Sequence, residues 1–166
     1  MSVSINGMLA PDPLHQPAVV FEALAEIGAG PSFPHSGLAV VHDGHGPDHI
    51  NRDDIDSMNS DQTDFEVATE NAPECVLIPD VPSDPPQHDR IRALAPLFHA
   101  LSTARNATSV ALVVLRGGDA APRGHDYAWH DACAEAARAV GIAQAGVYVF
   151  ARSVLARVRT GHAVTV

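Results

Sequence analysis

Lysine is absent from this 166-residue sequence, and all ten of its basic residues are arginine. The absence excludes every chemistry that needs a lysine amine, including Schiff-base catalysis and the phosphate-binding lysines of P-loop and kinase sites. Arginine and alanine in place of lysine are typical of a GC-rich genome, so we expect a bacterial source.

Cysteine is nearly absent too, since the chain contains only Cys75 and Cys133. Two cysteines without C-x-x-C spacing are too few for a disulfide framework. Cys75 opens an apolar stretch and Cys133 lies on the apolar face of a helical pattern. We therefore predict that both are reduced residues of the core.

Long hydrophobic runs are also lacking, and none approaches the roughly 18 residues of a membrane span. The first residues have no basic region followed by an apolar one, so we expect no secretion signal and a cytoplasmic protein. A hydrophobic content of 46% is ordinary for a globular chain. Its length predicts one domain over residues 1–166, with a loose leader at 1–16.

Charge is distributed unevenly along the chain. Residues 1–90 hold 16 acidic residues against two arginines, a formal balance of −14, whereas 91–166 hold 4 against eight, a balance of +4. The total of −10 disfavours nonspecific nucleic-acid binding, because phosphate is repelled. We expect a protein partner or a second copy of the chain, no nucleic acid and no membrane.

Alternating helix-like and strand-like patterns predict an α/β (or α+β) fold, a mixed β-sheet with helices packed on it. Pro96 interrupts the second helix, which either starts near Ala95 or is kinked there. Asp126 is the expected N-cap of the third helix. The final alternation predicts a half-exposed edge strand that is free to pair with a partner. The expected helices are 18–27, 89–105 and 127–140, and the expected strands are 36–42, 75–79, 110–115, 147–150 and 154–159.

The acidic stretch 43–74 has few apolar residues and many turn formers, so we expect a mobile, solvated loop. His42, His45 and His49 lie in or beside it at spacings that can take up a transition metal. A metal site is normally fixed on rigid elements, however, and we expect no metal and no other cofactor.

The strongest candidate site is the corner after the buried strand 110–115, where flexible and charged residues gather. Ligands of open α/β sheets bind at such strand ends, and a Gly-Gly pair lets a backbone approach a ligand closely. Two arginines here are able to pair with an anion. The alternative is a solvated turn with a helix-capping aspartate. The candidate binding residues are Arg116, Gly117, Gly118, Asp119, Arg123, His125 and Asp126.

Residues 88–158 resemble the JAB (MPN) domain of RadC-like proteins. The resemblance lies in a helix, the strand SVALVVL, the segment GGDAAPRGHD and the helix YAWHDACAEAARAVGI. It implies a JAB/MPN-like sheet as the alternative to a three-layer one, and Asp126 takes the place of the third zinc ligand. Val113 and Leu115 occupy the positions of the two zinc-binding histidines, so the resemblance implies a member that has lost its metal and its hydrolytic chemistry.

Three functions follow from these features. The leading hypothesis is a non-catalytic binding or assembly module, a pseudo-enzyme. The second is a metal-dependent hydrolase that uses Asp126 and nearby histidines; a His–Asp pair is able to act as a general base, but no partner nucleophile is evident. The third is a binder of a small anion or nucleotide at the 116–126 corner.

Overall fold

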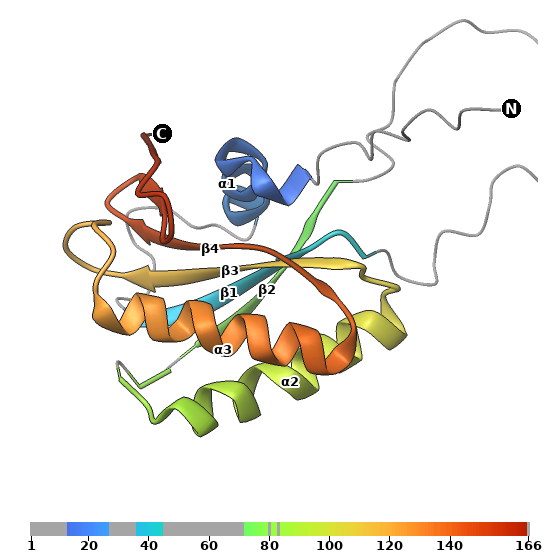
Figure 1. The fold of residues 1–166 in the computed structure, drawn as a ribbon. Helices are drawn as coiled ribbons and strands as arrows, with labels where there is room; N and C mark the ends of the chain where they lie inside the picture. The colour runs from blue at the N-terminus through green and yellow to red at the C-terminus, as the bar shows by residue number, and fades with distance from the viewer. Residues whose placement is uncertain (1–12, 27–35, 45–71, 80, 83, 166) are drawn as a thin grey trace, which may run out of the picture.

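The fold is a six-stranded mixed sheet with helices on both faces, seen in a computed structural model that describes residues 13–26, 36–44, 72–79, 81–82 and 84–165 (Figure 1). The strands lie in the order β2-β1-β3-β4-β5-β6, and only β3 and β4 are parallel. The elements are η1 (Pro13–His15), α1 (Pro17–Glu26), β1 (Ser36–His42), β2 (Glu74–Pro79), α2 (Gln87–Ala104), β3 (Ser109–Arg116), α3 (Gly124–Val140), β4 (Ala143–Ala151), β5 (Val154–Arg157) and β6 (Ala163–Thr165). The α/β prediction is confirmed.

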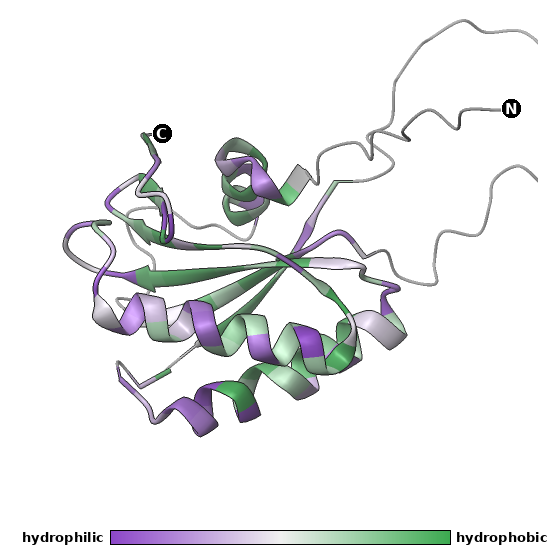
Figure 2. Ribbon diagram, viewed as in Figure 1, coloured by the Kyte–Doolittle hydropathy of each residue, from purple (hydrophilic) through white to green (hydrophobic). Residues whose placement is uncertain are grey.

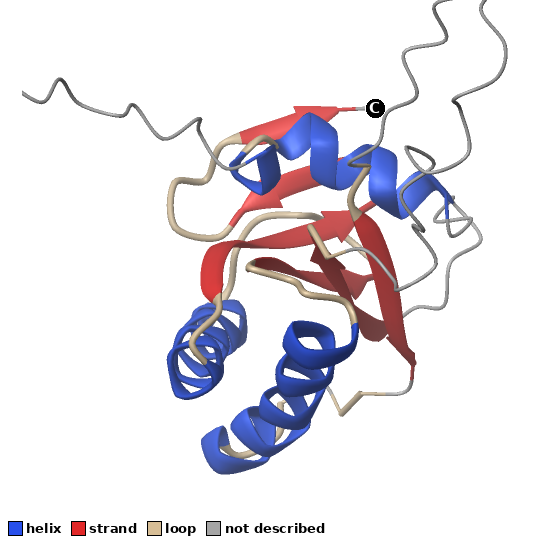
Figure 3. Cartoon of the chain, turned by 90° about the vertical axis from the view of Figure 1, so that its right-hand side faces the viewer, coloured by secondary structure: helices blue, strands red, loops and turns tan. Residues whose placement is uncertain are grey.

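Alternation along the strands builds two cores. Side chains such as Leu112 and Val149 pack with α2 and α3, whereas Val113 and Phe150 point to the opposite face, toward η1 and α1. Figure 3 shows α2 and α3 on one side of the sheet and α1 on the other. Because both faces are covered, β3 reads as one continuous apolar run, and Figure 2 colours it as hydrophobic.

The structure answers the question about Pro96, which lies inside α2 rather than at its first turn. Its missing N–H removes one helical hydrogen bond, but the residue is on the exposed side of the helix. No helix of the described residues is long and apolar enough to cross a membrane.

Two local predictions are wrong. The helix expected to start after Asp126 begins at Gly124 with Arg123 as its N-cap, so Asp126 is the third helical residue. The expected edge strand is not an edge either, because β5 pairs with β4 on one side and β6 on the other. The short strand Ala163–Thr165, which local pattern did not indicate, covers it.

Candidate functional site

The predicted corner is organised by a buried ion pair. Arg116 Nη1 lies 2.7 Å from Asp126 Oδ2, and the Asp126 side chain is fully buried while that of Arg116 is 11% exposed. The same oxygen accepts the backbone N–H of Arg123 at 2.6 Å. Asp126 therefore caps α3 from its third position and ties the helix to the end of β3.

The rest of the Arg116 guanidinium is bonded to the loop that follows it. Nε donates to the Asp119 carbonyl at 3.1 Å, and Nη2 donates to the Ala121 carbonyl. The loop is also closed by Asp119, whose carboxylate accepts from Ala121 N–H at 3.1 Å and from Arg123 Nη2 at 3.2 Å. The Ala121 N–H, and next the Arg123 guanidinium, hold the pKa of Asp119 below its ordinary value of 3.8.

His125 turns toward this ion pair. Its Nε2 lies 3.2 Å from Arg116 Nη1 and 3.3 Å from Asp126 Oδ1, an oxygen that has no hydrogen-bond partner in the described part of the chain. Nε2 of His125 therefore faces the Arg116–Asp126 ion pair and not a substrate. The His125 side chain as a whole is 30% exposed.

The predicted residues thus lie together in one corner, but their charged groups bind one another and not a ligand. Both arginines are paired with carboxylates, and Gly118 adopts φ 88°, a turn conformation that favours glycine. These contacts match those of a closed turn more closely than those of an open anion site.

The histidines proposed for metal binding are placed differently. His42 is 1% exposed at the end of β1, and its Nδ1 accepts the Gly44 N–H at 3.2 Å. His45 and His49 lie outside the described residues, as does most of the acidic stretch. The described residues contain no group of three side chains able to hold a metal ion.

The two cysteine thiols are also poor candidates for catalysis. Cys133 is buried in the α2–α3 core and Cys75 is half-buried on β2. Burial raises the pKa of each thiol to about 12. Neither is a nucleophile at neutral pH, because the reactive species is the thiolate.

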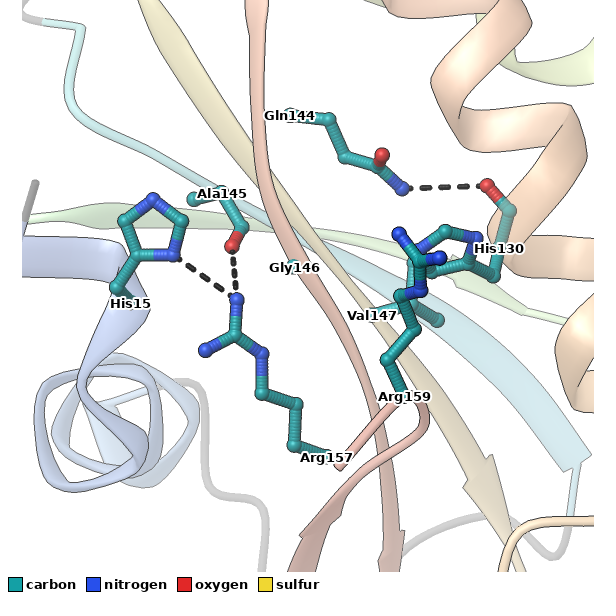
Figure 4. Close-up of a pocket in the computed structure, with 8 residues that line it drawn as sticks. All are labelled: His15, His130, Gln144, Ala145, Gly146, Val147, Arg157 and Arg159. Carbon is teal, nitrogen blue, oxygen red and sulfur yellow. Dashed lines mark hydrogen bonds between the residues drawn. The ribbon is translucent and has the colours of Figure 1, made fainter. Parts of the chain in front are cut away.

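A second site, which sequence reasoning missed, lies at the opposite end of β4. It is a pocket of about 150 Å³ between η1, α3, the start of β4 and the end of β5. We call it the basic pocket (Figure 4). Its lining residues are His15, His130, Gln144, Ala145, Gly146, Val147, Arg157 and Arg159.

An irregularity in β4 shapes the basic pocket. Val110 and Ala111 of β3 pair with Gln144 and Gly146, so Ala145 is an extra residue, a β-bulge. The freed Ala145 carbonyl accepts from Arg157 Nη2 at 2.8 Å. A Cβ on Gly146 would lie 3.1 Å from Tyr148 Cε2 and 3.3 Å from Arg157 Nε, so glycine leaves room for both side chains.

Comparison with protein-family models, with curated proteins and with solved structures finds no match.

The geometry of the basic pocket therefore stands on its own residues. Arg157 is fixed a second time, since Nη2 also lies 2.9 Å from His15 Nδ1 and the guanidinium carbon lies 5.9 Å from the centre of the Tyr148 ring. The Tyr148 hydroxyl in turn donates to the Leu14 carbonyl at 2.9 Å. Segments 142 residues apart thus meet at one guanidinium.

Arg159, the second cation of the basic pocket, has no counter-ion among the described residues. Arg159 is exposed and forms no ion pair or hydrogen bond with the described residues, and no carboxylate is among the residues that line the basic pocket in the described part of the chain. The pocket therefore concentrates positive charge on a strongly acidic protein.

One sequence signal was available for this site. Arg157 and Arg159 are two residues apart in an alternating segment, which predicts that both project from the same face, and they belong to the basic part of the chain. His15 and Gln144 carry no comparable signal, because only the tertiary structure brings them there.

Proposed function

We propose that the chain is a non-catalytic α/β binding module whose ligand is a small anion held in the basic pocket. The observation that carries this proposal is the pair Arg157 and Arg159, which line one hollow without a carboxylate among the described residues around it. An anion there would make charge-assisted hydrogen bonds with the guanidinium groups that line the pocket.

The size of the pocket limits the ligand. Pockets for drug-sized molecules have volumes of about 300–1,000 Å³, whereas this one has about 150 Å³. A free oxyanion fits, as does the anionic end of a larger molecule. We therefore move the anion-or-nucleotide hypothesis from the 116–126 corner to the basic pocket and narrow it to an anionic group.

Three features of the described residues support binding rather than catalysis. Cys133 is buried and Cys75 is half-buried, the His125–Asp126 pair lies against Arg116, and no group of three side chains in that part of the chain is able to hold a metal ion. A metal-dependent hydrolase built on Asp126 would have to break the Arg116 ion pair first. The relationship to RadC-like JAB domains, and a protein partner or second copy, remain proposals that no comparison supports.

The test is a titration with inorganic phosphate, followed by backbone NMR at low ionic strength. We expect shifts confined to residues around Gln144–Val147 and Arg157–Arg159, and an affinity at least about tenfold lower in Arg159→Gln, the loss of one charge-assisted contact. Arg92→Gln is the matched control, because Arg92 is exposed on α2 and is not among the residues that line the pocket.

Two results would overturn the proposal. One is the absence of any saturable shift at the pocket residues. The other is an equal loss in Arg159→Gln and Arg92→Gln, which would mean that phosphate responds only to the overall charge of the protein.

A further inference from the structure

The two histidines of the basic pocket present opposite hydrogen-bonding groups. A guanidinium donates and never accepts, so the contact between Arg157 Nη2 and His15 Nδ1, at 2.9 Å, requires an Nδ1 without a proton. The neutral His15 ring then carries its proton on Nε2. The nitrogen that His15 has left for a ligand is a donor.

His130 has the reverse arrangement. Its Nδ1 lies 3.3 Å from the Asp131 carboxylate, which only accepts, so the proton of the neutral ring is on Nδ1. Nε2 is left as an acceptor, and it has no hydrogen-bond partner among the described residues. The side chain is 17% exposed and lines the pocket (Figure 4).

Apart from the Gln144 side-chain oxygen, the other polar side-chain groups of the pocket lining are donors, or lie against Arg157 as His15 does. Both arginines donate, and the Gln144 amide nitrogen donates to the His130 carbonyl at 3.2 Å. Nε2 of His130 is the ring acceptor in a pocket otherwise rich in donors. An anion whose oxygens are all unprotonated would place a lone pair against it.

We infer that His130 makes the basic pocket selective for small anions that carry a hydroxyl beside the charged group. The hydroxyl donates a hydrogen bond to His130 Nε2, and the arginines bind the charged group. Hydrogen phosphate and 2-hydroxy carboxylates share this chemistry. The inference rests on the proposed function, and it adds the class of ligand and the residue that recognises the ligand.

Two pairs of anions, matched in charge, test the contribution of the hydroxyl to binding separately from that of the charge. At about pH 8, hydrogen phosphate and sulfate are both dianions and only phosphate carries a proton. Lactate and propionate form the corresponding carboxylate pair. Each pair is titrated by calorimetry at constant ionic strength, and the two pairs separate an inorganic ligand from an organic one.

We expect at least about tenfold tighter binding of the hydroxylated member in one pair, since a site built for a donor rejects the analogue that lacks it. In His130→Phe, which keeps a ring but has no acceptor, the ratio should fall to about one while binding persists. His15→Ala should weaken both members of a pair equally.

The outcomes separate the two proposals. If no anion binds the natural chain, the proposed function fails. If anions bind but neither pair is discriminated, or if His130→Phe keeps the preference, the role of His130 is wrong and anion binding stands. Nitrogen NMR of the free protein adds a readout that needs no variant: His130 protonated on Nε2 and bare at Nδ1 would also overturn the inference.

Discussion

Arg116 Nη1 and Asp126 Oδ2 lie 2.7 Å apart and join the last residue of β3 to the first turn of α3. Asp126 is completely buried, and its oxygen also accepts the N–H of Arg123. The pair therefore fixes the βα corner that sequence alone marks as a binding site. The same contacts that make the corner rigid take its cations away from any ligand.

Removing the charge of Asp126 should destabilise the fold. Asp126→Asn leaves Arg116, 11% exposed, without its carboxylate, and breaking a buried pair costs about 3–5 kcal/mol of unfolding free energy. Urea denaturation measures this. Asp131→Asn is the control, because Asp131 is 78% exposed and its loss should cost less than about 1 kcal/mol. Equal effects of the two substitutions would show that the corner pair is not structural.

Arg90 and Trp129 form a second buried contact. We expect replacement of Arg90 to cost more stability than replacement of its partner Asp84. The Arg90 guanidinium carbon lies 5.4 Å from the Trp129 ring centre, and Nη2 lies 2.5 Å from Asp84 Oδ1. Asp84→Ala leaves the buried Arg90 guanidinium without its carboxylate, but Asp84 is 77% exposed and water is able to take its place, so the cost should be only about 1 kcal/mol, less than at the fully buried Asp126. Arg90→Ala also loses a desolvated cation–π contact and should cost about 2 kcal/mol or more.

Urea unfolding followed by Trp129 fluorescence measures both variants, since Trp129 is the single tryptophan of the chain. Arg90→Ala should also shift the emission of the folded state, whereas Asp84→Ala should not. A larger cost for Asp84→Ala than for Arg90→Ala would contradict the assignment.

The two thiols should be inert in the folded protein. Burial raises both pKa values to about 12, so only a very small fraction of either thiol is ionised at about pH 8. We expect alkylation by iodoacetamide to be at least about a hundredfold slower than in urea, and to accelerate as the pH rises toward 12. Single Cys75→Ser and Cys133→Ser variants assign each rate. A fast phase in the folded protein would show that one site opens.

Asp119 gives the corner a pH dependence. Its folded pKa is held below the ordinary 3.8 by the Ala121 N–H and by Arg123. A lowered pKa means that the carboxylate stabilises the fold above pH 3.8 and that this contribution is lost as the pH falls through the folded value. Asp119→Asn should therefore be less stable than the natural chain at neutral pH, and the difference should vanish in acid. A difference that persists unchanged in acid would assign the effect to loop shape.

Sequence patterns located most of the secondary structure because burial on both faces leaves a strong signature. The continuous apolar run of β3 and the helical spacing of Trp129 and Cys133 need no long-range information. Cys133 is a core residue, as expected, and Trp129 packs in the same core. The lysine-free composition and the absence of a cysteine framework also followed from the sequence alone.

What only the tertiary structure decided is which polar groups meet. Local sequence marks Arg116 and Arg123 as available cations, but folding brings Asp126 and Asp119 to them and leaves Arg157 and Arg159 beside a pocket. It also adds β6 to what looked like an edge. The physical reason is that backbone periodicity reports whether a position is buried, whereas the partner of a charged side chain can be distant in the chain, as His15 is from Arg157.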